Sequence, residues 1–65
     1  MIPRMPSPAA LFDDWLIAET EATLALQAWR AARPFGKRRA HASYLAALDR
    51  EEHAATRLAS RLQFA

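Results

Sequence analysis

The chain has 65 residues, a formal net charge of +2 and no cysteine. Disulfides and thiolate zinc sites are therefore excluded, and association with another chain is the remaining way to stabilise so small a domain. Valine is absent and glycine occurs once, whereas the strong helix formers alanine, leucine and arginine are abundant. This composition predicts an all-α fold.

Residues 1–6 contain two of the four prolines and belong to no periodic pattern, so we expect a flexible N-terminal arm. The acidic pair Asp13 and Asp14 follows soon afterwards, which argues against a signal peptide. No apolar run approaches the ~20 residues that cross a bilayer. We therefore expect a cytoplasmic protein without a membrane span.

Residues 7–65 are expected to form one helix-turn-helix hairpin. Ser7 and Pro8 are a strong helix start, because serine caps free N–H groups and proline is well accepted at the first helical position. The first helix is expected to span about 8–32. It ends before Pro34, because the residue that precedes a proline avoids helical geometry.

The turn is expected at 33–36, with Gly36 as its one flexible position. The second helix is expected at about 37–62. Because the two helices are similar in length and the link is short, they should pack antiparallel as a hairpin.

Each predicted helix carries an apolar run whose members are spaced by three and four residues, as in helices that pack together. The run on the first helix is bulky at its ends and small in its middle, which allows close approach and fixes the register. We expect the hairpin seam to consist of Leu11, Trp15, Ala18, Ala22, Ala25 and Trp29 with Tyr44, Leu48, Ala55, Leu58 and Leu62. Folding the chain about Phe35 pairs Trp29 with His41, Ala22 with Leu48 and Trp15 with Ala55.

The first helix has a second apolar strip, formed by Ile17, Leu24, Ala28 and Ala31. A helix that is apolar on two sides usually contacts two neighbours. We expect this strip to be a second interface, which makes the protein a homo-oligomer, most simply a two-fold dimer that forms a four-helix bundle and otherwise a tetramer. The alternative is that Ile17 and Leu24 are scattered exposed residues, which are common on protein surfaces.

Glu51 interrupts the seam of the second helix. The favoured interpretation is that it pairs with an arginine, of this chain or another, and helps to fix the register. A weaker hypothesis is a carboxylate metal site that a symmetric bundle builds from Glu19, Glu51 and Glu52. The Glu-x-x-His spacing of di-iron bundles is missing, so we expect no metal and no cofactor.

Five of the nine basic residues cluster at the hairpin tip, namely Arg30, Arg33, Lys37, Arg38 and Arg39. Three of these residues lie at the start of the second helix, where the helix dipole disfavours positive charge. The cluster suggests contact with phosphate, which makes a nucleic-acid-binding regulator the alternative function. It is also consistent with simple pairing to acidic residues of another chain.

The sequence shows no serine, histidine and aspartate arranged to form a catalytic nucleophile and no glycine-rich phosphate loop. We therefore expect that the protein is not an enzyme. The leading prediction is a small helical scaffold, adaptor or regulator that acts through homo-oligomerisation and contacts with other proteins.

Overall fold

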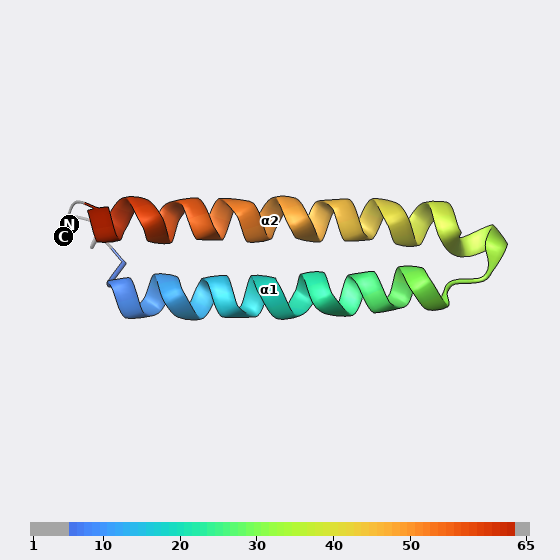
Figure 1. Cartoon of the computed structure of the whole chain (residues 1–65), viewed down its shortest axis with the longest axis horizontal. Helices are drawn as coiled ribbons and strands as arrows, with labels where there is room; N and C mark the ends of the chain where they lie inside the picture. The colour runs from blue at the N-terminus through green and yellow to red at the C-terminus, as the bar shows by residue number, and fades with distance from the viewer. Residues whose placement is uncertain (1–5, 64–65) are drawn as a thin grey trace, which may run out of the picture.

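A computed structural model describes residues 6–63 of the chain as two long helices packed side by side (Figure 1). Helix α1 spans Pro8–Ala31, the short 3-10 helix η1 spans Pro34–Gly36, and helix α2 spans Lys37–Gln63. The predicted all-α helical hairpin is confirmed. The predicted arm at 1–6 lies outside the described residues except for Pro6, which precedes α1 without regular structure.

The beginning of α1 is formed by Ser7 and Pro8. The Ser7 Oγ accepts a hydrogen bond of 3.1 Å from the backbone N–H of Ala10, and the Ser7 carbonyl accepts one of 3.0 Å from Leu11. Pro8 occupies the first helical position, where its missing N–H costs nothing. The expected N-cap is therefore present.

The turn between the helices is held by the backbone. Arg33 is extended, as the residue before Pro34 should be, and its carbonyl accepts a 2.8 Å hydrogen bond from the N–H of Gly36. Gly36 does not have a positive φ, and a Cβ atom added to it meets nothing within 4 Å. The conformation of the turn therefore makes no use of the freedom that Gly36 was expected to supply.

The close contact between the helices is made by small side chains. Among residues 6–63, the buried side chains are those of Leu11, Ala18 and Ala22 on α1 and of Ala47 on α2. Ala47 is only 1% exposed. Alanine at these positions lets the two backbones approach closely, as the small middle of the predicted seam requires.

The seam of α2 differs from the predicted one. Leu48 and Leu62 were expected in it, but they are 37% and 57% exposed, and Ala47 takes the central position. Leu48 lies instead in a groove beside the seam, together with Tyr44 and Glu51, which were expected on the same side of α2.

The hairpin is a narrow rod. Its Cα extents are 48 × 22 × 14 Å and its radius of gyration is 15.0 Å, compared with about 11 Å for a compact chain of this length. The accessible surface is 5408 Å², whereas a compact protein of 7.3 kDa exposes about 4,200 Å². A single chain therefore buries less of its surface than a compact domain does.

Candidate interaction surfaces

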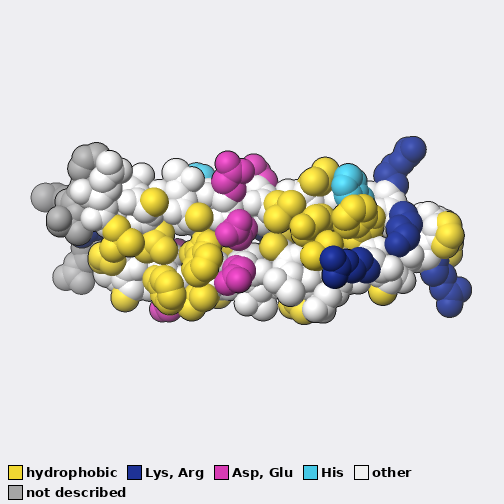
Figure 2. Space-filling model, viewed as in Figure 1, with side chains coloured by type: hydrophobic (Ala, Val, Ile, Leu, Met, Phe, Trp, Pro, Cys, Tyr) yellow, Lys and Arg dark blue, Asp and Glu magenta, His cyan; other side chains and the backbone are white. Residues whose placement is uncertain are grey.

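One side of the rod carries a groove between the helices with carboxylates at its centre. We call it the carboxylate groove; its lining residues are Glu19, Ala22, Thr23, Leu26, Tyr44, Leu48 and Glu51. Figure 2 shows this arrangement on the visible face, where hydrophobic side chains form two groups separated by acidic side chains near the middle of the rod.

Glu51 is held in the groove by a tryptophan. The indole Nε1 of Trp15 donates a hydrogen bond of 2.8 Å to Glu51 Oε1. Within the described residues the partner of Glu51 is therefore a tryptophan and not the expected arginine, while pairing with an arginine of another chain stays a prediction. A hydrogen bond to a charged acceptor is stronger than one between neutral groups, which explains how a half-buried carboxylate is tolerated in this position.

In the described part of one chain, the carboxylates of the hypothetical metal site do not form a complete site. Glu19 and Glu51 line the same groove, as their predicted levels in the hairpin require, and Glu52 is exposed beside them. Within residues 6–63, no group of three or more histidines and carboxylates lies close enough to hold a metal ion. A carboxylate site would therefore need residues from a second copy.

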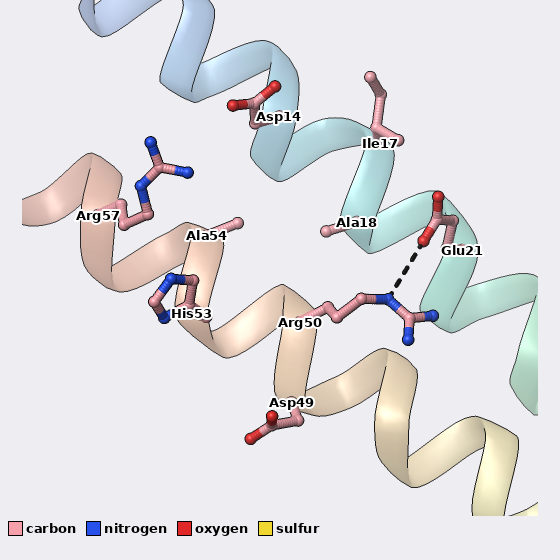
Figure 3. Close-up of a pocket in the computed structure, with 9 residues that line it drawn as sticks. All are labelled: Asp14, Ile17, Ala18, Glu21, Asp49, Arg50, His53, Ala54 and Arg57. Carbon is pink, nitrogen blue, oxygen red and sulfur yellow. Dashed lines mark ion pairs between the residues drawn. The ribbon is translucent and has the colours of Figure 1, made fainter. Parts of the chain in front are cut away.

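The other side of the rod is charged. Its shallow pocket is drawn in Figure 3, where the Arg50 side chain reaches from α2 across to Glu21 on α1 and Asp49 points away from the gap. The Arg50 Nε atom lies 3.6 Å from Glu21 Oε2, and both side chains are about half exposed. Such a surface pair contributes little stability, typically below about 1 kcal/mol. It does partly offset the charge of Glu21, which lies four positions after Ile17.

The predicted second interface is uncovered in the hairpin. Ile17 is 59% exposed and Leu24 is 58% exposed, and Ala28 and Ala31 are exposed as well. Ile17 also borders a shallow depression on the outer side of α1. Helix α2 therefore covers only one side of α1.

At the hairpin tip, one of the five basic residues has a structural task. Lys37 Nζ donates hydrogen bonds to the carbonyls of Trp29 at 2.9 Å and of Arg30 at 3.3 Å, and so caps the C-terminal end of α1. This contact explains why a lysine is accepted at the start of α2. Arg33, Arg38 and the apical Phe35 are exposed, and Phe35 reaches 90%.

No protein-family model, curated protein sequence or solved structure matches this chain. Neither α1 nor α2 has an apolar stretch of the length needed to cross a membrane. The function proposed below therefore depends on the residues and geometry of the described part of the chain.

Sequence reasoning missed Ala47 and the Trp15–Glu51 hydrogen bond. A signal for Ala47 was present in the sequence, because a run of residues that includes Ala47 follows the same alternation of four and three positions as the predicted run on α1, and every member of that run is buried or half-buried in the structure. These residues are Ala40, Tyr44, Ala47, Glu51, Ala54 and Leu58. No comparable pattern predicts that an indole N–H meets the Glu51 carboxylate.

Proposed function

We propose that this protein is a non-enzymatic helical scaffold or small regulator that associates with a second copy of itself and acts through protein contacts. The observation that carries the proposal is the imbalance around α1. This helix is apolar on several sides, yet α2 covers only the side that bears Leu11, Ala18 and Ala22. A helix that is apolar on two sides usually contacts two neighbours.

The surface area supports the same proposal. The hairpin exposes roughly 1,200 Å² more than a compact protein of its mass. A standard interface covers about 800 Å² on each partner. Pairing two rods lengthwise therefore hides an amount of surface that brings the hairpin close to the compactness of an ordinary domain.

In the proposed assembly the two α1 helices meet antiparallel through the strip of Ile17, Leu24, Ala28 and Ala31. Ile17 and Leu24 are two helical turns apart on one strip, so a two-fold axis between them places Ile17 of one copy against Leu24 of the other. The alanines allow close approach. Glu21, four positions after Ile17, is already paired with Arg50, which limits its cost beside this contact. The product is a four-helix bundle with α1 inside and α2 outside.

The test compares the same substitution on the two helices. Leu24 on α1 and Leu45 on α2 are 58% and 51% exposed, so a glutamate at either position leaves the hairpin itself little changed. We expect light scattering across a dilution series to show a dimer or tetramer for the wild type and for Leu45→Glu. Leu24→Glu should raise the dissociation constant by at least about 100-fold, because it places an unpaired charge in the interface.

Circular dichroism on the same samples reports whether the hairpin depends on assembly. Helicity that falls as the complex dissociates means that the second copy completes the core. A wild type that is monomeric at every concentration contradicts the proposal. Equal effects of Leu24→Glu and Leu45→Glu contradict the assignment of the interface to α1.

A further inference from the structure

The hairpin tip combines an exposed aromatic ring with unpaired positive charge. Phe35, at 90% exposure, is the most exposed of the large hydrophobic side chains in residues 6–63. The basic residues about it are Arg30, Arg33, Lys37, Arg38 and Arg39, and no acidic residue lies between 30 and 39. We propose that the tip docks end-on to an anionic lipid surface, with Phe35 entering the headgroup region and the basic side chains contacting lipid phosphates.

The local electrostatics make the tip uniformly positive. Lys37 binds the last carbonyls of α1, which offsets the negative end of that helix, while the positive N-terminal end of α2 lies at the same place. Within residues 6–63, the arginines at 30, 33, 38 and 39 take part in no ion pair. Their charge is therefore available to an external partner.

The geometry favours a flat partner. The tip is one end of a rod 48 Å long, and Figure 2 shows basic side chains leaving this end in opposite directions, with hydrophobic atoms at the extreme end. A flat surface that meets this end can contact Phe35 and basic side chains on opposite sides of the rod together (Figure 2). A nucleic-acid duplex is curved and is usually followed along its grooves by a row of side chains on one face of a protein. We therefore infer a membrane surface rather than nucleic acid.

The expected binding is weak, reversible and dependent on salt. Each arginine near an anionic membrane surface strengthens binding by about fivefold, and screening at high ionic strength removes much of this gain. Insertion of one phenylalanine ring adds about tenfold or more. This property goes beyond the proposed self-association and is tested separately from it, since Phe35, Arg38 and Arg39 lie beyond Ala31, the last residue of the strip.

The experiment measures sedimentation of the full chain with two kinds of vesicle, pure phosphatidylcholine and phosphatidylcholine with about one third phosphatidylserine. We expect binding only to the anionic vesicles, with loss at high salt. The double variant Arg38→Ala/Arg39→Ala should weaken binding by about 25-fold, and Phe35→Ala by about tenfold. Circular dichroism verifies that each variant keeps its helicity.

The matched control is Arg57→Ala/Arg61→Ala, which removes the same net charge from the far end of α2 and leaves the Arg50–Glu21 pair intact. It should lower vesicle binding by less than about threefold, because those residues lie more than a Debye length from the tip. Absence of binding to anionic vesicles at low salt overturns the proposal. Equal losses in the two double variants also overturn it. A short RNA hairpin is tested in parallel, and retention on RNA without binding to vesicles assigns the tip to nucleic acid instead.

Discussion

The two halves of the hairpin hold their tryptophans in different ways. In the half near the turn, the centroid of the Trp29 ring lies 4.6 Å from the ring centroid of His41 and 5.7 Å from that of Tyr44. In the half near the termini, Trp15 uses its N–H to bind the Glu51 carboxylate at 2.8 Å. Between the two halves the seam narrows to alanines.

The contacts of Trp29 hold the two helices together, whereas the hydrogen bond of Trp15 fixes how they are aligned. Ring contacts such as those of Trp29 depend mainly on buried area and accept small shifts of one helix along the other. The Trp15–Glu51 hydrogen bond has a narrow range of distance and angle, so it favours one register. The half near the turn therefore contributes cohesion, and the half near the termini adds the polar contact that specifies alignment.

The largest expected effect comes from the alanines that join the two halves. Ala47→Glu places a charge at a position that is 1% exposed and should lower the free energy of unfolding by about 3 kcal/mol or more. For a hairpin with so small a core, we expect loss of helicity in circular dichroism at room temperature. Ala46→Glu, on the exposed side of α2, is the control and should remain folded. A folded Ala47→Glu variant with an unchanged melting temperature means that the two halves do not meet at this alanine.

Substitutions of the two tryptophans should change the free energy of unfolding by a smaller amount. Trp15→Phe removes the donor to Glu51 and should lower the free energy of unfolding by about 1–2 kcal/mol. Trp29→Phe keeps a ring against His41 and Tyr44 and should cost less than about 1 kcal/mol. Thermal and urea unfolding of both variants give the two values. Equal costs at the two sites mean that the hydrogen bond contributes nothing beyond the size of the ring.

The smallest change in the free energy of unfolding is expected for a substitution in the turn. Gly36→Ala adds a Cβ atom that meets nothing within 4 Å, at a residue without a positive φ. Alanine restricts the unfolded chain more than glycine does, so the variant should be more stable by about 0.4–1 kcal/mol. Thermal unfolding followed by circular dichroism measures the difference. A clear loss of stability would show that the half near the turn depends on a backbone conformation that only glycine adopts.

Much of the fold follows from local rules. Ser7 and Pro8 predict the start of α1, Pro34 predicts its end, and counting residues outward from Phe35 predicts the contact of Trp29 with His41, which the structure confirms. These features depend on residues close in sequence or on the simple geometry of a hairpin. They can therefore be read from the chain without knowledge of the packing.

The details that escaped prediction depend on how the helices rotate. Ala47 and Leu48 are both apolar neighbours, and only the narrow space opposite Ala22 selects the smaller one. Likewise, an arginine is the usual partner of a carboxylate, and only the final rotation brings the Trp15 indole to Glu51.

The order of contacts along the hairpin has a consequence for how the chain acquires its shape. Trp29 and His41 are 12 positions apart in the sequence, whereas Trp15 and Glu51 are 36 apart. Closing the longer loop in an unfolded chain costs about 1 kcal/mol more than closing the shorter one. We therefore expect the hairpin to form from its tip toward its termini, with the aromatic contacts near the turn bringing the helices together before the polar contact aligns them.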